Sequence, residues 1–387
     1  MAKKMLFLFV LLLSLTGMLK AQVTTAGMSG KVMADEESVI GATVVAVHEP
    51  SGTSYGTVTN VDGRFSLQGM RSGGPYKVTV SYIGYQTAIY TGIQLQLGET
   101  YSLNVTLHEA SELLGEITIT ASKSKFSAEK TGATTNISSE QLTTLPSINR
   151  SISDFTRISP YASGNSFGGR DGRSNTFTVD GANLNNNFGL SSGLPGGGNP
   201  ISLDAIDEVQ VVIAPYDVRQ ANFIGAGINA ITKSGTNAYR GSAYMYFNNE
   251  VMRGNKIGDT DFGARAEESK TVYGATFGGP IIKDKLFFFA NVEYEKSPQQ
   301  VITWRAAKEG ETPNNSTISR TTEADLAEFS QILKDKYGYN TGSFTDFPAD
   351  VTNLKLLGRI DWNINQGNKL SVRYNFTNNK TWEAPNG

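Results

Sequence analysis

The sequence predicts a mainly β chain in three parts: a small β-sandwich, a compact α+β unit, and a series of long amphipathic strands. Composition is the first observation, because 41 of the 387 residues are Gly and 10% are aromatic, which is typical of chains rich in strands and turns. The second observation is the alternation of apolar and polar residues. It recurs along most of the chain with the period of two that strands require.

The first 21 residues have the pattern of an export signal. Lys3 and Lys4 precede an unbroken apolar run, residues 5–13, and the small residue Ala21 ends the segment. This run is much shorter than the ~20 apolar residues that a transmembrane helix needs, which disfavours a membrane anchor. We therefore expect residues 1–21 to form a cleaved secretory signal peptide.

Residues 22–110 have the pattern of a small β-sandwich. Asp62-Gly63 lies between two alternating runs, and this pair is a strong hairpin signal because Gly accepts a positive φ without strain. Short runs separated by turns predict a sandwich. The runs are residues 29–33, 41–47, 55–59, 64–67, 76–82 and 102–107.

The order of short motifs in this region resembles the carboxypeptidase regulatory-like domain. The motifs are Gly30-x-Val32, Gly41-Ala42-x-Val44, Thr59-Asn60-x-Asp62-Gly63-x-Phe65-x-Leu67, Tyr76-x-Val78-x-Val80 and Gly84-Tyr85. The resemblance implies a non-catalytic accessory sandwich, related in fold to carbohydrate-binding modules. Asn60 and Asp62 could suggest a calcium loop, but the turn explains both of them. His48 is expected on a strand surface.

Residues 111–130 contain one short β-prone run, which a polar segment rich in Lys and Ser follows. A lone strand with open edges can add to the sheet of another protein, and main-chain hydrogen bonds then provide the affinity. Two other interpretations stay open, in which the run is the last strand of the sandwich or the first strand of the next domain. The run consists of Glu116, Ile117, Thr118, Ile119, Thr120 and Ala121.

Residues 131–237 combine two short helices with strands. Ser138 and Gln141 have the spacing of a capping box, and Pro146 ends this first helix. Residues 151–158 place apolar side chains on one helical face before the next proline. Residues 206–213 then form a strand-like run rich in Val and Ile, so we expect a compact α+β unit.

This region resembles the plug domain of a TonB-dependent outer-membrane receptor, over residues 115–237. The matching pieces are Arg170, the Thr178-Val-Asp180-Gly181 turn, the Ile206-x-x-Val209-x-Val211 strand, Pro215 with Arg219, and Gly227-Ile-Asn229-x-x-Thr232-Lys233-Ser-Gly. One position departs, since many plugs of the family have Tyr-Gly after the arginine that matches Arg219, whereas this chain has Gln220-Ala221. With the leading sandwich, the chain resembles the Oar-like branch, common in Bacteroidetes-type bacteria.

The resemblance implies roles for particular residues. Residues 116–121 lie where this family has its TonB box, the peptide that pairs with a strand of periplasmic TonB. Arg170 and Arg219 are expected as buried partners that hold the plug to the barrel. The plug motif and its barrel contacts comprise Arg170, Asp180, Gly181, Arg219, Asn229 and Lys233. The loop over residues 183–198 is a candidate for ligand contact, with Asn183, Asn185, Asn186, Asn187 and Phe188 at its start.

From residue 238 the alternation is strongest, with one apolar face and one polar or charged face along each run. In a soluble sandwich the apolar face would point inward, whereas in a membrane barrel it faces lipid and the charged face lines the lumen. Runs of about ten residues with aromatic ends favour the membrane barrel. The runs are residues 239–248, 270–277, 285–295, 354–364 and 369–376.

The connections support the same interpretation. Residues 365–368 form a short turn, while residues 297–350 are long and polar, and outer-membrane barrels have short turns on one side and long loops on the other. A capped helix is predicted over 322–337, with acidic residues at its start, lysines near its end and Gly338 after it. Its apolar stripe is expected to dock on neighbouring loops.

About five barrel strands can be counted, which is fewer than a closed barrel needs. Plugged outer-membrane transporters have about 22 strands and the smallest membrane barrels have about 8, and lipid does not tolerate the open edges of a five-stranded arc. We therefore expect residues 238–387 to be the truncated start of a barrel. The chain would be the N-terminal fragment of a longer receptor or a truncated gene product.

Several functional classes are disfavoured. The chain has no Cys and two His, His48 and His108, both in the sandwich and without ligand spacing, so we expect neither catalytic residues nor a metal or cofactor site. A net charge of −2 gives no case for nucleic-acid binding. An enzyme is therefore not expected.

The favoured fold is mainly β: an N-terminal β-sandwich, an α+β plug domain and the first strands of an incomplete transmembrane β-barrel. The favoured function is ligand import across the outer membrane with energy from TonB, and the sandwich would lie in the periplasm. Expected partners are TonB, outer-membrane lipid and an unidentified extracellular ligand, with a surface lipoprotein as a further candidate. The alternative is an exported carbohydrate- or protein-binding surface module without transport.

Overall fold

The computed structural model describes most of the chain after the expected signal peptide. The described residues are 23–34, 36–109, 117–120, 133–147, 150–185, 194, 199–215, 220, 223–261, 268–299, 305–314, 318–344, 349–365 and 367–381. They fall into two units, one with residues 1–241, 276–291 and 357–375 and the other with residues 242–275, 292–356 and 376–387. The prediction for residues 1–21 lies outside the described residues. No described helix is both long and apolar enough to cross a membrane.

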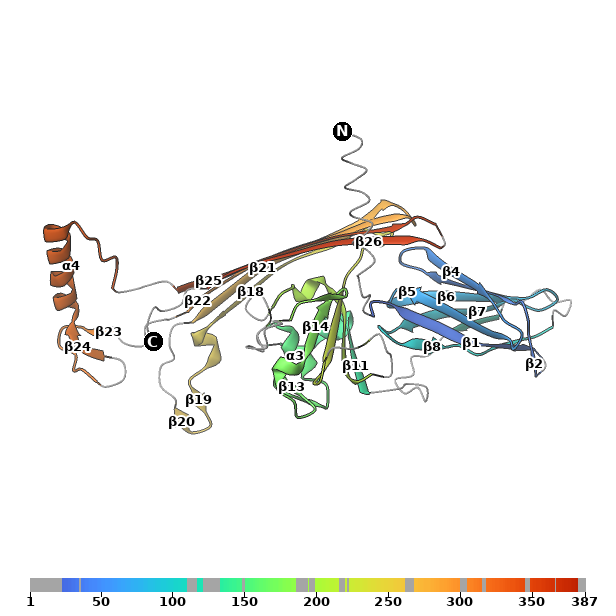
Figure 1. Cartoon of the computed structure of the whole chain (residues 1–387), viewed down its shortest axis with the longest axis horizontal. Coiled ribbons are helices and arrows are strands. Elements are labelled where there is room, and N and C mark those ends of the chain that lie inside the picture. Colours follow the sequence, from blue (N-terminus) through green and yellow to red (C-terminus); the bar gives the residue numbers. More distant parts are fainter. Residues whose placement is uncertain are drawn as a thin grey trace, which may run out of the picture. The chain divides into compact units, whose positions relative to one another are not determined.

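The N-terminal part is a sandwich of two five-stranded sheets (Figure 1). In the first sheet β1 pairs with every other strand, antiparallel to β2 and β5 and parallel to β8 and β9. Its strands are β1 (Ala26–Ala34), β2 (Glu37–Ser38), β5 (Arg64–Met70), β8 (Thr100–Ser102) and β9 (Val105–Leu107). The second sheet has the order β10-β7-β6-β3-β4. Its strands are β3 (Thr43–His48), β4 (Thr53–Val58), β6 (Gly73–Ser81), β7 (Ala88–Leu95) and β10 (Ile117–Thr120).

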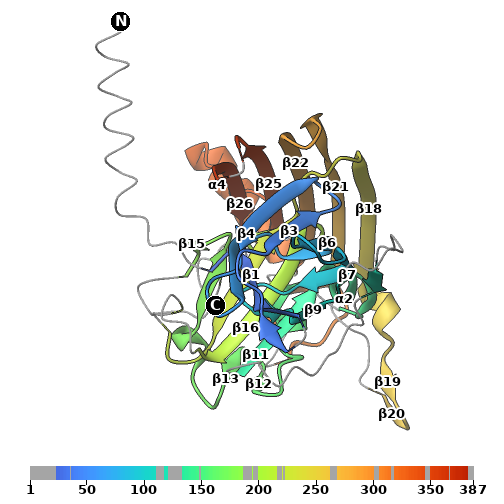
Figure 2. The ribbon, with the colours of Figure 1, turned by 90° about the vertical axis from the view of Figure 1, so that its right-hand side faces the viewer.

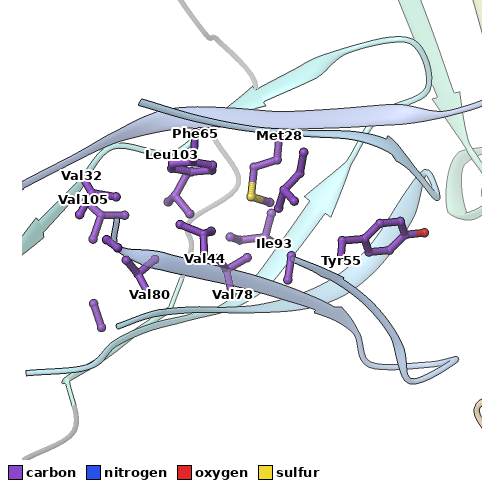
Figure 3. Close-up of a cluster of buried hydrophobic side chains, with 14 of the residues drawn as sticks. Met28, Val32, Val44, Tyr55, Phe65, Val78, Val80, Ile93, Leu103 and Val105 are labelled. Atoms are coloured by element: carbon purple, nitrogen blue, oxygen red, sulfur yellow. The ribbon is translucent and has the colours of Figure 1, made fainter. Parts of the chain in front are cut away.

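Apolar side chains from both sheets fill the space between them, as Figure 3 shows. Val44 and Ala46 of β3 alternate with more exposed neighbours, and Val78 and Val80 of β6 do the same. Each fully buried side chain of this size contributes about 1.5–3 kcal/mol relative to exposure. The predicted turn is confirmed, because the Asn60 side-chain oxygen accepts hydrogen bonds from the backbone N–H groups of residues 62 and 64.

His48 does not lie on the strand surface as expected. It is 7% exposed, continues the inward-facing series of β3, and its Nδ1 is 2.7 Å from the Ser51 Oγ. Burial lowers the pKa of His48 to about 4, and the Arg71 charge acts in the same direction. The imidazole is therefore neutral at ordinary pH and belongs to the packing of the sandwich.

The α+β unit is built on one five-stranded sheet of order β11-β16-β17-β14-β15. The strands are β11 (Ala133–Ser138), β14 (Thr176–Val179), β15 (Ala182–Asn183), β16 (Ile206–Ala214) and β17 (Gly227–Thr232). Smaller elements are α2 (Ser139–Thr144), α3 (Ile152–Thr156), β12 (Ala162–Ser163), β13 (Ser166–Phe167), η2 (Gly172–Ser174) and η3 (Leu203–Ala205). The capping box of Ser138 and Gln141 is confirmed, whereas α3 ends before Ile158, which is 46% exposed.

Five long strands follow and form one sheet of order β18-β21-β22-β25-β26, whose strands stand side by side in Figure 2. They are β18 (Arg240–Asn249), β21 (Ser269–Ile282), β22 (Leu286–Gln299), β25 (Ala349–Asn363) and β26 (Lys369–Lys380). Large apolar side chains remain exposed along them, including Met245 at 58%, Phe277 at 51% and Val372 at 56%. This is the pattern of a surface that faces lipid, and the described strands do not close into a barrel.

Smaller elements lie in the connections of this last region. They are η4 (Glu250–Arg253), β19 (Lys256–Ile257), β20 (Thr260–Asp261), β23 (Arg305–Ala307), β24 (Ile318–Thr322) and α4 (Glu323–Tyr337). The predicted helix is confirmed as α4, with a capping box between Thr322 and Asp325 and a left-handed Gly338 after it. No residue of α4 is fully buried, but Leu326 and Leu333 of its apolar stripe are half-buried, while Phe329 is exposed. Among the described residues the expected docking of this stripe is therefore partial.

Candidate functional site

Asp180 lies at the turn after β14 and organises the end of the neighbouring strand β17. Its backbone has a φ of 50°, a left-handed conformation that Asp tolerates better than most residues. One carboxylate oxygen accepts the Thr232 N–H at 3.0 Å, and the other accepts the Thr232 hydroxyl at 2.6 Å. The turn thus presents a carboxylate that is 7% exposed.

Two arginines from neighbouring barrel strands approach this carboxylate. Arg359 of β25 places Nη1 4.0 Å from one Asp180 oxygen, and Arg373 of β26 places Nε 3.5 Å from the other. The Arg359 Nη1 also donates to the Thr232 carbonyl, and its Nε donates to Asp361 at 2.7 Å. Because these charges are largely buried, removal of one partner would leave the others uncompensated. Asp180 therefore joins the plug sheet to the barrel strands.

The sandwich contacts the same charged cluster. Arg71, which follows β5, donates from Nη1 to the Ser234 hydroxyl at 2.8 Å, and its Nη2 lies 3.9 Å from Asp361. On β4, the Tyr55 ring lies beneath the Lys369 ammonium, with 3.2 Å between Nζ and the ring centroid. Cation–π contacts of this kind favour a fixed approach of the two groups. The sandwich, the plug exit and the barrel strands thus meet through polar side chains.

A row of polar side chains crosses the plug sheet in register. Thr178, Asn229, Gln210 and Asn136 occupy adjacent positions on β14, β17, β16 and β11. The Thr178 hydroxyl donates to Asn229 at 2.7 Å, and Asn229 donates to Gln210 at 3.5 Å. Gln210 and Asn136 both donate to the carbonyl of Leu97, in the turn between β7 and β8. The row therefore connects the plug sheet to the sandwich.

Glu208 extends this row on β16. Its two oxygens each accept the Leu97 N–H at 3.1 Å, and one also accepts an N–H from Asn136 at 3.2 Å. Burial raises the pKa of Glu208 to about 7, against the opposing effect of the Leu97 hydrogen bond. Asp207, next to it, also has a raised pKa because of burial, although the Lys233 charge opposes the shift. The carboxyl of Glu208 therefore titrates near neutral pH.

The residues named in the sequence analysis fall into different environments. Arg170 is exposed, and its backbone N–H donates to Phe167. Within the described part of the chain the buried arginine contacts to the plug come from the barrel strands instead. Lys233 follows β17 and donates its N–H to Ala205. Arg219 lies outside the described residues, and its expected role remains a prediction.

The candidate ligand loop is described at its start. The Asn185 side chain accepts the Phe177 N–H at 2.6 Å and donates to the Asn175 carbonyl at 2.7 Å. The Asn183 side chain accepts the Asn185 N–H at 2.8 Å. These amides fix the backbone at residues 183–185, and contact of this region with a ligand remains a prediction. Asn186, Asn187 and Phe188 lie outside the described residues.

The run over residues 116–121 is described at Ile117–Thr120, which forms β10. It pairs in parallel with β7, from Ile117 opposite Ala88 to Thr120 opposite Thr91. The structure therefore agrees with the open interpretation in which this run is the last strand of the sandwich. This pairing does not test whether the run binds TonB, so that role remains a prediction. Glu116 and Ala121 lie outside the described residues.

Several functional groups escaped sequence reasoning. Arg359 and Arg373 occur in alternating strands where any charged residue is expected to face the lumen, so nothing in the pattern indicates that they pair with Asp180. Glu208 and Gln210 did carry a signal, because they are polar residues two positions apart in a strand rich in Val and Ile. This spacing places both side chains on one face of the strand, so the pattern indicates a polar face in the sheet.

Comparison with known proteins agrees with this architecture. A family profile described as the carboxypeptidase regulatory-like domain matches residues 27–108, and one described as the outer membrane beta barrel domain matches residues 231–387. The TonB-dependent transporter Oar of Myxococcus xanthus is 25% identical over 344 residues, which cover 84% of this chain and 30% of the transporter. The chain resembles the N-terminal part of an Oar-like TonB-dependent receptor. The match to an outer membrane beta barrel domain, together with the similarity to this transporter, locates the chain in the outer membrane.

Two solved structures are similar to part of this chain at low sequence identity. The siderophore receptor PirA from Acinetobacter baumannii is 19% identical, with a TM-score of 0.42 over 64% of this chain and 31% of that receptor. The outer membrane transporter YddB from Escherichia coli is 14% identical, with a TM-score of 0.41 over 64% of this chain and 33% of that transporter. This chain thus spans about a third of the length of Oar, PirA and YddB.

Proposed function

We propose that this chain is the N-terminal portion of a TonB-dependent outer-membrane transporter. It would bind an extracellular ligand and import it with energy transmitted by TonB, and the sandwich would lie in the periplasm. The observation that carries the proposal is a plug-like sheet whose Asp180 carboxylate is approached by arginines of two barrel strands. The similarity to the transporter Oar supports the same function.

The contacts of the plug suit a part that must move. Most of its apolar core lies within the unit, where Ile137, Phe155 and Val209 pack together, but Phe289 of β22 and Leu357 of β25 belong to the same cluster. Its contacts to β25 and β26 also include the ion pairs of Asp180, whose charged groups water can solvate when they separate. Movement of the plug would therefore break these ion pairs and expose a small part of the apolar cluster, while most of the plug core stays packed.

The order of the strands suggests where force would act first. Residues 116–121 precede β11, and β11 is the edge strand of the plug sheet. It pairs only with β16 among the described strands, from Ala133 opposite Ala214 to Ser138 opposite Glu208. A pull on the preceding segment would therefore separate β11 from one end, one residue pair at a time.

Deletion of residues 116–121 tests the proposal. In the complete receptor, this deletion should abolish capture by the immobilised periplasmic domain of TonB and should abolish ligand uptake, while ligand binding at the cell surface remains. The matched control is deletion of residues 122–127, the six residues that follow, five of which are Ser or Lys. Capture and uptake equal to those of the unmodified receptor would contradict the proposal, and a surface-binding module without transport would then account for the chain.

A further inference from the structure

The second sheet of the sandwich has two edges with different environments. At one edge, β4 contacts residues of the barrel strands and their turns. Thr53 accepts a hydrogen bond from the Asn363 amide at 2.9 Å, and Tyr55 lies beneath Lys369. At the other edge, β10 pairs with β7 on one side, and no other described strand pairs with it. The outward-facing main-chain groups of β10 are thus the open edge of this sheet.

The β7 side of this pairing is built to hold a strand. Ala88 and Tyr90 pack with the sandwich core, so Ile89 between them faces the opposite side, because side chains alternate along a strand. Ile89 is nevertheless 4% exposed and is not part of the core cluster. It lies opposite Thr118 in the register. A large apolar side chain is therefore buried on this face of β7 at the position that pairs with β10.

The added strand is short. It makes four residue pairs with β7, whereas β4 and β6 each make six with β3. A peptide of four residues that must first become extended pays an ordering cost when it binds a partner. On the sandwich this cost is already met, because residues 117–120 are held extended by β7.

We propose that the sandwich is a platform that presents β10 as a preformed strand edge, to which a strand of TonB adds as the next strand of the sheet. The inference rests on the proposed function, since it requires TonB as the partner. Main-chain hydrogen bonds to the open edge of β10 would provide the affinity. The pairing with β7 would be kept during capture, because a strand offers separate donors and acceptors at its two edges.

A cross-link between β7 and β10 separates this proposal from its opposite, in which the sandwich hides the strand from TonB. The chain has no Cys, so Thr91→Cys with Thr120→Cys introduces one pair. Neighbouring strands lie about 4.8 Å apart, a distance that a disulfide spans. The control pair, Thr57→Cys with Thr120→Cys, joins opposite edges of the sheet at about 19 Å and should not cross-link.

The readout is capture of the detergent-solubilised complete receptor by the immobilised periplasmic domain of TonB. We expect the β7–β10 cross-link to form under oxidation and to leave TonB affinity within about twofold of the reduced protein. Absence of the cross-link, or loss of capture that reductant restores, would overturn the platform. Loss of capture on deletion of residues 116–121 tests the proposed function separately, so the two failures are distinguishable.

A second variant weakens the platform without a cross-link. Ile89→Ser removes the buried apolar side chain at the position that pairs with β10 and should weaken TonB capture about tenfold. Ile83→Ser is the matched control, because Ile83 is 94% exposed in the same sandwich, and it should leave capture unchanged. Tighter capture by Ile89→Ser than by the unmodified receptor would overturn the proposal, since release of β10 would then expose the TonB-binding strand.

Discussion

Glu208 shows how one residue can make folding depend on pH. Its carboxyl group is buried between β16 and the Leu97 turn, and its pKa is raised from 4.5 to about 7. Between these two values the folded chain binds a proton that the unfolded chain has released. The free energy of unfolding therefore falls as pH rises through this window, and the loss is complete above about pH 7.

Substitution of Glu208 by Gln should remove this dependence. The amide keeps an oxygen for the Leu97 N–H but carries no charge, so the variant should be more stable than the wild type at pH 8, by at most about 3 kcal/mol. Chemical unfolding at pH 5 and pH 8 measures the difference. Glu140→Gln, at an exposed position of α2, is the control. An unchanged pH profile in the Glu208 variant would contradict the assignment.

At the scale of elements, the turn between β7 and β8 carries the contact between the sandwich and the plug sheet. Gly98 in this turn has a φ of 70°, and a Cβ there would lie 2.8 Å from the Gln210 amide nitrogen. Gly69, in β5, has nearly the same φ, 68°, and nothing within 4 Å of the Cβ position. The two glycines therefore share a conformational requirement and differ in their neighbours.

This pair allows the contact to be measured. Gly98→Ala and Gly69→Ala should each lose about 1–2 kcal/mol because of the left-handed backbone. Only Gly98→Ala should also displace the Gln210 side chain and disrupt its hydrogen bond to Leu97. Displacement of the turn should also weaken the hydrogen bond from the Leu97 N–H to Glu208. Hydrogen exchange at this N–H should therefore accelerate at least tenfold more in the Gly98 variant than in the Gly69 variant. Equal acceleration would mean that the turn does not hold the plug sheet.

At the scale of the molecule, Asp180 links elements that are far apart in the sequence. Its carboxylate is bound by Thr232 of β17, and arginines of two barrel strands approach it. Asp180, Arg359 and Arg373 are charged and largely buried, so the stability of the cluster depends on every charged partner being present.

Loss of the Asp180 charge should loosen the plug in the complete receptor. Asp180→Asn leaves Arg359 and Arg373 without this partner, and we expect cells that produce the variant to take up a large antibiotic such as vancomycin at least fivefold faster. Asp171→Asn is the control, because Asp171 forms an exposed pair with Arg173 on the same unit. Equal uptake in both variants would show that the ion pairs do not retain the plug.

The sequence allowed good prediction of whatever depends on neighbouring residues. Period-two alternation predicted the strands, Ser138 and Gln141 predicted the start of α2, and Asp62-Gly63 predicted the turn in the sandwich. The expected surface position of His48 is wrong, although His48 follows Val44 and Ala46 at the inward-facing spacing. The pairing of Asp180 with Arg359 depends on strands 179 residues apart, and no local pattern carries that information.

The polar row across the plug sheet has a consequence for how such proteins can evolve. Without the Leu97 turn, this face of the sheet would present polar side chains to water, from Thr178, Asn229, Gln210 and Asn136. If the gene lost the segment that encodes the sandwich, the plug would therefore expose polar rather than apolar side chains along this row. Accessory modules could be gained, exchanged or discarded at this junction with few compensating substitutions.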